Sequence, residues 1–238
     1  MNRLSLLEVR KLNVAYGRLQ VLWDINISLS TNNVVGIIGP NGAGKTTLLK
    51  TIAGTIKPLS GEINYMGQKI NGLPAHERVK QGIVYVPDSS GVFGKMSVYD
   101  NLILGAYLKR DQLNETLKFV YELFPTLHER RNQRAGTLSG GEKQMLVIAR
   151  ALMVKPKVLL LDEPSTGLSP IAVKNLFTSL EKLLSTTDLS IILVEQDVGR
   201  ALKISKYVYL MEGGHVRDEG PSNEFSKVEK LRKFYVGA

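Results

Sequence analysis

Short runs of consecutive apolar residues predict a buried sheet. One run covers residues 34–38 and leads into a glycine-rich turn. A parallel strand is covered on both faces, so it reads as a continuous apolar segment and not as an alternating one. The same pattern predicts further strands at residues 158–161, 191–194 and 207–211, and the alternation of strands with helices over about 157–220 predicts one more at 215–219.

Two regions in the first third of the chain alternate apolar with polar positions instead. Residues of about 6–30 and 61–70 show this pattern, with turns expected at Asn13, Gly61 and Gly67. Alternation of this kind is typical of strands with one buried face. We therefore expect an antiparallel β portion beside the parallel sheet.

The middle of the chain has helical spacing. It extends over residues of about 95–156 and begins at Ser97 and Asp100, which have the form of a capping box. The whole chain, residues 1–238, is thus expected to be one α/β domain. It would combine a mostly parallel central sheet, an antiparallel β portion and an inserted helical lobe over about 95–156.

The turn after the first apolar run fits a phosphate-binding loop. It matches G-x-x-x-x-G-K-[ST] and consists of Gly39, Pro40, Asn41, Gly42, Ala43, Gly44, Lys45, Thr46 and Thr47. Its glycines let backbone N–H groups face phosphate oxygens, and the helix that follows adds its positive end. Lys45 would reach the β- and γ-phosphates of ATP, and the Thr46 hydroxyl would ligate Mg²⁺. The alternative, a plain glycine-rich turn, is disfavoured by the Lys-Thr pair and the preceding strand.

Two adjacent carboxylates, Asp162 and Glu163, follow the apolar run at 158–161. Ligands of open α/β sheets bind at the carboxyl ends of the strands, so both acids should lie beside the phosphates. Asp162 is the candidate for holding Mg²⁺ through its water shell. Glu163 is the candidate for polarising the water that attacks the γ-phosphate. The alternative, a solvated acidic turn, would not explain the apolar residues before it.

A third motif, Leu138-Ser139-Gly140-Gly141-Glu142, precedes apolar residues at helical spacing. On its own it would be a helix with Ser139 as N-cap. Between the other two motifs it resembles the signature sequence of ATP-binding cassette (ABC) ATPases, a family of P-loop NTPases. The resemblance implies a dimer with a second ABC ATPase subunit, identical or homologous. Ser139, Gly140 and Gly141 would then contact the γ-phosphate of the ATP on the partner's P-loop.

The resemblance assigns roles to further positions. Tyr16 matches the aromatic residue that stacks on adenine, although a strand aromatic of this kind is also common in a core. Asp88 stands in the Q-loop, where most of the family has Gln, and its carboxylate could accept a hydrogen bond from a Mg²⁺-bound water. Gln196 replaces the usual switch His, so it can donate to the γ-phosphate but cannot carry a proton. The predicted catalytic residues are therefore Glu163, Lys45 and Gln196.

Several of these departures together resemble one subgroup. Glu-Gln at the switch, Gly-Leu-x-Pro in the D-loop and an acid after Val-Pro resemble the second ATPase subunit of branched-chain amino acid importers, the LivF type. That group usually has Glu at the position of Asp88. Residues 231–237 also resemble its C-terminal ending. The resemblance implies an ATPase that powers membrane permease subunits, on which a substrate-binding protein acts indirectly.

Composition excludes several other classes of site. The 238 residues, 43% of them hydrophobic, are enough for one large core. The absence of cysteine excludes disulfides, cysteine–zinc sites and cysteine nucleophiles. No signal peptide is recognisable, and no apolar stretch approaches the ~20 residues of a membrane helix. If the chain works at a membrane, it should do so as a peripheral subunit, and the resemblance to transporter ATPases implies the cytoplasmic face of the cell membrane.

The formal net charge of +9 permits a different function. Basic proteins often bind nucleic acid, so a non-transport ABC module acting on nucleic acid or ribosomes is the alternative. Such modules commonly carry a long coiled-coil insertion or two cassettes, and this chain has neither, so no nucleic acid is expected as a partner. A slow regulatory cassette is a third possibility, because Asp88, Ser169 and Gln196 all depart from the family pattern.

The segment after Asp88 admits two interpretations. Val92 and Phe93 lie in a Gly- and Ser-rich stretch, where an exposed apolar side chain could contact a permease helix. Alternatively, Phe93 packs into the helical lobe, since isolated aromatic residues usually find a core. The exposure of Phe93 distinguishes the two.

Overall fold

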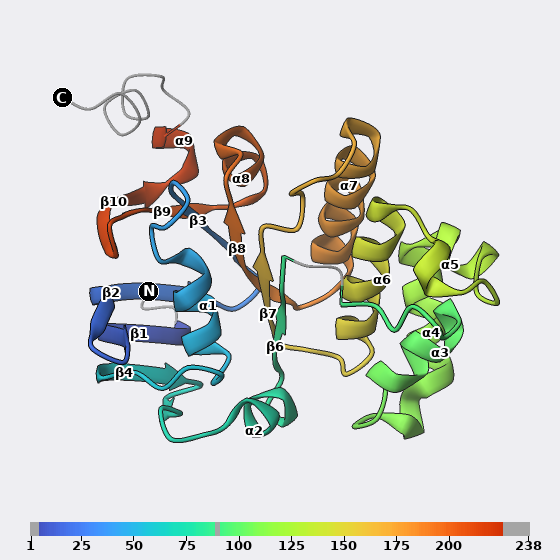
Figure 1. Cartoon of the computed structure of the whole chain (residues 1–238), viewed down its shortest axis with the longest axis horizontal. Helices are drawn as coiled ribbons and strands as arrows, with labels where there is room; N and C mark the ends of the chain where they lie inside the picture. The colour runs from blue at the N-terminus through green and yellow to red at the C-terminus, as the bar shows by residue number, and fades with distance from the viewer. Residues whose placement is uncertain (1–4, 89–90, 226–238) are drawn as a thin grey trace.

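A six-stranded sheet forms the centre of the molecule (Figure 1). The computed structural model describes residues 5–88 and 91–225. The strands of this sheet are β3 Val34–Ile38, β6 Ile83–Val86, β7 Val158–Asp162, β8 Ser190–Glu195, β9 Tyr207–Glu212 and β10 His215–Pro221. Their order is β10-β9-β3-β8-β7-β6, with β10 antiparallel to β9 and the other neighbours parallel. The strands predicted from the apolar runs are confirmed.

A second, four-stranded antiparallel sheet has the order β2-β1-β4-β5. Its strands are β1 Ser5–Tyr16, β2 Leu19–Ser30, β4 Ser60–Tyr65 and β5 Gln68–Lys69. The turns predicted at Asn13 and Gly61 are wrong, because both residues lie within strands, whereas the turn predicted at Gly67 is confirmed between β4 and β5. The pairing of β1 with β4 shifts register between Arg10 and Asn13. Gly61, at φ 89°, faces this bulge so closely that a Cβ atom would lie 2.3 Å from the Lys11 carbonyl oxygen.

Helix α1 (Lys45–Ile52) lies between the two sheets. Its Leu48, Leu49 and Ile52 are fully buried in one apolar cluster with strand residues from both sheets. Alternate residues of the central strands, such as Leu160 and Ile192, point toward this cluster. The burial of α1 between two sheets fixes the position of its N-terminus, where the phosphate-binding loop ends.

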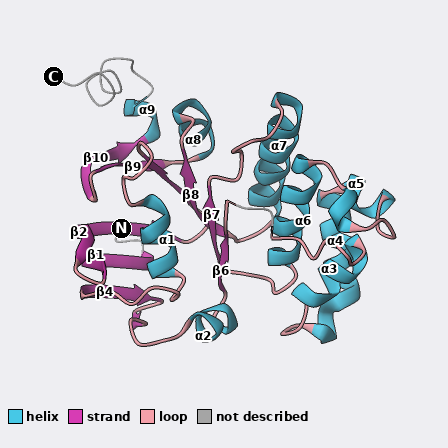
Figure 2. Cartoon of the chain, in the orientation of Figure 1, coloured by secondary structure: helices cyan, strands magenta, loops and turns pink. Residues whose placement is uncertain are grey.

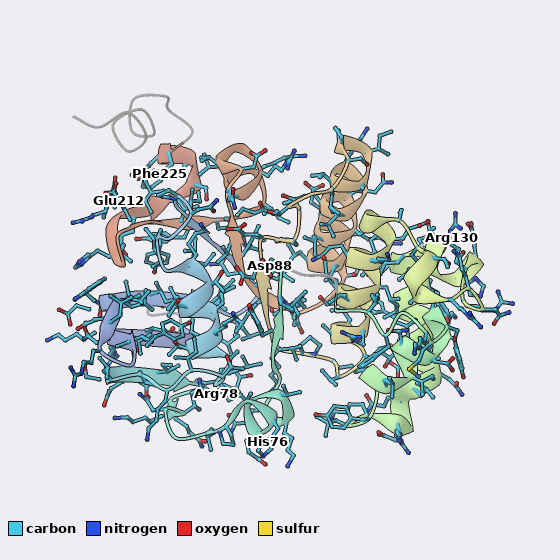
Figure 3. The ribbon with its side chains drawn as sticks, viewed as in Figure 1. His76, Arg78, Asp88, Arg130, Glu212 and Phe225 are labelled. Atoms are coloured by element: carbon cyan, nitrogen blue, oxygen red, sulfur yellow. The ribbon has the colours of Figure 1, made fainter. Side chains whose placement is uncertain are left out.

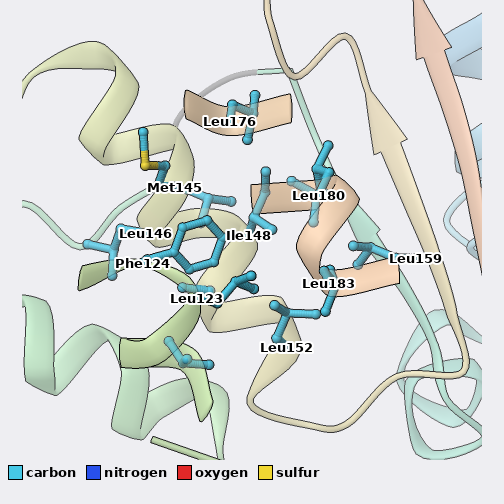
Figure 4. Packing of buried hydrophobic residues seen from close by; sticks show 14 of the residues in the cluster. Leu123, Phe124, Met145, Leu146, Ile148, Leu152, Leu159, Leu176, Leu180 and Leu183 are labelled. Atoms are coloured by element: carbon cyan, nitrogen blue, oxygen red, sulfur yellow. The ribbon is translucent and has the colours of Figure 1, made fainter. Parts of the chain in front are cut away.

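The opposite face of the central sheet packs against helices (Figures 2 and 4). Leu159 and Leu161 of β7 join a cluster with Ile148, Leu176 and Leu180. These helices are α3 Val98–Gly105, α4 Leu113–Leu123, α5 Pro125–Glu129, α6 Gly140–Leu152 and α7 Pro170–Thr186. The first four form the lobe predicted over about 95–156.

Arg78, on the short helix α2 (Ala75–Lys80), is 1% exposed (Figure 3). Its guanidinium donates to five backbone carbonyls, those of Thr51, Ile52, Leu73, Ile70 and Asn71. Burial lowers the pKa of Arg78 to about 10. Because Thr51 and Ile52 end α1, the side chain satisfies carbonyls at the negative end of that helix.

The remaining helices are α8 Val198–Ile204 and α9 Ser222–Phe225, with 3₁₀ turns at Arg110–Gln112 and Ala135–Thr137. Within residues 5–88 and 91–225, no helix is long and apolar enough to cross a membrane. The resemblance noted at residues 231–237 falls outside the described part of the chain.

Candidate functional site

The phosphate-binding loop joins the end of β3 to the start of α1. Gly42 and Gly44 have φ values of 82° and 96°, which favour glycine. Gly39 passes so close to β9 that a Cβ atom would lie 2.1 Å from the Met211 carbonyl oxygen. No side chain caps α1, whose N-cap residue is Gly44. Its first N–H groups are therefore available to an anion.

A cavity of about 310 Å³ opens over this loop. It is lined by Val21, Asn41, Gly42, Ala43, Gly44, Lys45, Thr46, Thr47, Asp88 and Glu163. The structure thus brings most of the predicted loop residues together with Asp88 and Glu163, which are distant in sequence.

Lys45 is 4% exposed and curls back over its own loop. Its Nζ donates to the carbonyl oxygens of Gly39 at 2.8 Å and Pro40 at 3.0 Å. The same Nζ lies 3.3 Å from Glu163 Oε1. The ammonium group is thus held at the cavity, where it can leave the Glu163 carboxylate and bind phosphate oxygens instead.

Asp162 is fully buried at the end of β7. Its Oδ1 accepts a hydrogen bond from Thr46 Oγ1 at 3.0 Å, and its Oδ2 accepts one from the Tyr85 hydroxyl at 2.8 Å. Burial raises the pKa of Asp162, and these two hydrogen bonds act against that shift. The hydroxyl and the carboxylate are the hard oxygen ligands that Mg²⁺ prefers.

These donors fit a magnesium ion that takes its other ligands from substrate and water. Among the described residues, no group of three His, Cys, Asp or Glu side chains could hold a metal by itself. Magnesium usually binds through one or two protein oxygens plus substrate phosphates and water. Thr46 and Asp162, beside a phosphate-binding loop, match that requirement.

Glu163 follows Asp162 and has an unusual backbone, with φ 44°. Its Oε2 accepts hydrogen bonds from Gln196 Nε2 and, at 3.3 Å, from Thr166 Oγ1. Gln196 Nε2 also donates to Asn41 Oδ1 at 2.8 Å. Gln196, which follows β8, therefore bonds both the phosphate-binding loop and the Asp162–Glu163 pair. Gln196 orients Glu163 and touches the loop, as expected for a residue of this site.

Tyr16 and Asp88 lie at the edges of the cavity. Tyr16 is 51% exposed, so the alternative that it belongs to the core is wrong. Its hydroxyl lies 3.4 Å from Thr47 Oγ1, close enough to place the ring beside the loop. Asp88 lines the cavity and lies near the centre of the molecule in Figure 3. Its proposed role with a metal-bound water remains a prediction.

The signature residues lie apart from this cavity, at the start of α6. Ser139 caps α6: its Oγ accepts from the Glu142 N–H, and its own N–H donates to Glu142 Oε2 at 2.8 Å. Gly141 packs so closely on α7 that a Cβ atom would lie 2.5 Å from Ala172 Cβ. Ser139 and Gly140 are exposed. They do not contribute to the phosphate cavity of their own chain, as the predicted composite site requires.

Two residues of this region have contacts that the sequence does not predict. Tyr85 lies within β6, directly before the Q-loop residues, and its hydroxyl bonds Asp162 across the sheet. Glu195, 1% exposed, accepts hydrogen bonds from the N–H and Oγ of Ser165 at 3.2 and 2.9 Å. Burial raises the pKa of Glu195 to about 7 against these bonds. A charged residue at the end of an otherwise apolar strand is the available signal for Glu195, whereas no local pattern identifies the partner of Tyr85.

Phe93 is 50% exposed, so the core interpretation of this residue is wrong. It borders a groove of about 480 Å³ that also includes Tyr85, Leu104 and Tyr107. The Arg150 guanidinium carbon lies 5.0 Å from the centre of the Phe93 ring. The groove lies where the segment after β6 meets the helical lobe.

Comparison with known proteins agrees with this geometry. A sequence model of the ABC transporter family matches residues 22–166. The branched-chain amino acid transport ATP-binding protein BraG of Pseudomonas aeruginosa is 40% identical over 98% of this chain and 100% of its own length. A probable LivF protein of Archaeoglobus fulgidus is also 40% identical, over 98% of this chain and 99% of its own. The lipopolysaccharide export protein LptB of Haemophilus influenzae is 32% identical, with 98% of each chain covered.

Solved structures give the same result for the fold. The crystal structure of a nucleotide-free ATP-binding cassette from an ABC transporter has a TM-score of 0.87 and 25% identity, covering 99% of this chain and 100% of its own. The expected arrangement of a mainly parallel sheet, an antiparallel β portion and a helical lobe is that of this cassette. The chain therefore belongs to the ABC transporter family, as one of its ATP-hydrolysing subunits.

Proposed function

We propose that the chain powers the import of branched-chain amino acids. One observation carries this proposal: the relatives named for that transport are 40% identical over nearly the full length, against 32% for LptB. Export of lipopolysaccharide is the second candidate, because LptB is also similar over nearly its whole length. Both candidates use the same ATPase site.

The proposed mechanism starts with ATP on the phosphate-binding loop. The backbone of residues 39–47 and the N-terminus of α1 would bind its phosphates, and Lys45 would turn from Glu163 to them. Tyr16 would stack on adenine. Thr46 and Asp162 would hold Mg²⁺, with Asp88 accepting from a metal-bound water; the ion supplies charge neutralisation for the transferred phosphoryl group.

Hydrolysis would then depend on Glu163 and on a second subunit. Glu163, oriented by Gln196, would accept a hydrogen bond from the attacking water. Gln196 cannot itself titrate, so it would act as a donor to Glu163 or to phosphate. Ser139, Gly140 and Gly141 of a second cassette would complete the site at the γ-phosphate. A site shared by two chains makes turnover depend on dimer closure.

The partners follow from this arrangement. A permease would supply the path across the membrane, since no described helix of this chain can do so. The exposed Phe93 ring and its groove would receive a permease segment at the cytoplasmic face of the membrane. A substrate-binding protein would act on the permease from the other side, and so only indirectly on this chain.

Transport by a reconstituted complex tests the proposal. The chain, its partner cassette and the permease encoded beside it should drive ATP-dependent uptake of leucine into vesicles. Phe93→Ala should reduce uptake several-fold while sparing basal ATP hydrolysis, because the side chain is half exposed and does not line the cavity over the phosphate-binding loop. Leu59→Ala is the matched control, since Leu59 is 61% exposed on a different surface.

Each negative result would exclude one part of the proposal. A complex that hydrolyses ATP but moves lipopolysaccharide and not leucine would replace the first candidate by the second. Equal uptake by the Phe93→Ala and Leu59→Ala variants would remove Phe93 from the coupling role.

A further inference from the structure

Tyr85 connects two strands at the metal-binding end of the sheet. It lies on β6, beside β7, in parallel register with Leu160. From there its hydroxyl reaches forward to Oδ2 of Asp162 at 2.8 Å. The ring on the same side chain lines the groove that Phe93 borders. A residue of the Q-loop strand is thus in direct contact with the carboxylate proposed to hold Mg²⁺.

The contact is one of only two hydrogen bonds that position the Asp162 side chain among the described residues. The other comes from Thr46, whose oxygen can ligate the metal while its O–H still donates to Asp162. The Tyr85 bond is therefore the one contact of the two that comes from a side chain with no proposed metal-binding role of its own. Since Asp162 is fully buried, water offers Oδ2 no ready substitute for this donor.

The direction of this bond follows from its geometry. The Tyr85 hydroxyl is the donor and Oδ2 of the Asp162 carboxylate is the acceptor.

We propose that Tyr85 is a positioning residue of the metal site: its hydroxyl fixes the orientation of the Asp162 carboxylate and so sets the affinity for the metal ion that accompanies ATP. This inference rests on the proposed function. Ligating carboxylates are themselves commonly held by outer hydrogen bonds, and losing such a partner typically lowers metal affinity about 10- to 100-fold. The Tyr85 hydroxyl occupies that outer position here.

The test removes one oxygen atom. Tyr85→Phe keeps the ring, its packing and the groove. Tyr65→Phe is the matched control, because Tyr65 is also a strand tyrosine with its hydroxyl in a single hydrogen bond, donated to the Gln81 carbonyl at 3.1 Å; Tyr65 is buried, whereas Tyr85 is partly buried. Each full-length variant is titrated with Mn²⁺ in the presence of a non-hydrolysable ATP analogue, and bound Mn²⁺ is measured by electron paramagnetic resonance. Analogue affinity in EDTA and the melting temperature are measured in parallel.

The expected result separates metal binding from stability. The Kd for Mn²⁺ should rise roughly 10- to 100-fold in Tyr85→Phe and less than twofold in Tyr65→Phe. Analogue affinity in EDTA should be unchanged in both, and their melting temperatures should fall by similar amounts. Because the readout is metal binding, a role in stability alone would not produce this pattern.

Three results would overturn the proposal. Equal Mn²⁺ affinity in wild type and Tyr85→Phe would show that the hydroxyl does not set the metal site. Weaker analogue binding in EDTA would assign the hydroxyl a general structural role. A wild-type chain without bound Mn²⁺ would refute both this inference and the proposed use of Thr46 and Asp162, whereas the first two results leave the proposed function intact.

Discussion

The helices α1 and α6 both direct an N-terminus at phosphate in the proposed dimer, but the two N-termini are built differently. At α1 the N-cap residue is Gly44, which has no side chain to satisfy the first N–H groups. At α6 Ser139 and Glu142 satisfy each other in a capping box. The first N-terminus lies over a cavity beside a buried lysine, and the second is exposed on the lobe.

The difference shows which N-terminus depends on nucleotide. The open end of α1 leaves donors that ATP would satisfy, so this region gains most from binding. Its opposite end is closed by Arg78, which fixes the helix while the N-terminus stays open. The start of α6 needs no ligand to be well formed. Substitutions in the two regions should therefore change different measurements.

The largest effect should come from the chemistry beside α1. Glu163→Gln should lower kcat about 10²- to 10⁴-fold, because the amide cannot accept a proton from the attacking water. ATP should still bind, since Lys45, Thr46 and the loop are unchanged. Initial-rate assays and equilibrium binding of ATP measure the two quantities. A variant that keeps most of its kcat would exclude Glu163 as the general base.

Arg78→Met should cause the largest loss of stability. The free energy of unfolding should fall by about 3 kcal/mol or more, because several buried carbonyls lose their donor. Arg10→Met is the matched control: the Arg10 side chain is 60% exposed and forms a surface ion pair with Glu8 at 2.8 Å. Denaturant unfolding of both variants measures the difference. Similar losses in the two would mean that the carbonyl contacts of Arg78 contribute little to stability.

Ser139→Ala should have the smallest effect on stability, about 1 kcal/mol. Ser97→Ala is its control, because Ser97 forms the capping box of α3 and its replacement should lower the free energy of unfolding by about the same amount. Only Ser139→Ala should weaken the ATP-dependent dimer of the Glu163→Gln variant, measured by light scattering. Equal dimerisation in both would count against a shared site.

The cost of Ser139→Ala should also depend on pH. Burial acts to raise the pKa of Glu142, but the hydrogen bonds from Ser139 and the charge of Arg130 lower it overall. A carboxyl group with a lowered pKa stabilises the fold above its unfolded pKa of ~4.3 and loses that contribution as the pH falls through the folded value. The difference between Ser139→Ala and wild type should therefore shrink in acid.

Local patterns predicted the parts of the site that one segment specifies. The phosphate-binding loop, the Asp162–Glu163 pair and the capped start of α6 each have their residues adjacent in sequence. The apolar runs also predicted β3, β7, β8 and β9, because an apolar run is a property of each strand alone, whereas β6 was not predicted as a strand. These features required no knowledge of pairing.

Features that depend on distant partners were not predictable in the same way. The strand positions of Asn13 and Gly61 depend on a bulge between two strands, so their turn-like residue types were misleading. Arg78 satisfies carbonyls up to 27 positions away, and Tyr85 bonds a residue 77 positions away. Only the folded sheet brings these groups together.

Because Ser139 and Glu142 satisfy each other's hydrogen bonds within one chain, two proposed partners could separate without either one losing a folded element. Each subunit would return to solution with its α6 still capped and with no new buried polar group left unpaired. The two subunits would then associate and dissociate as fully folded proteins, and they would do so at every turnover. Subunits of this kind could exchange between complexes during the life of the protein, without a chaperone or resynthesis.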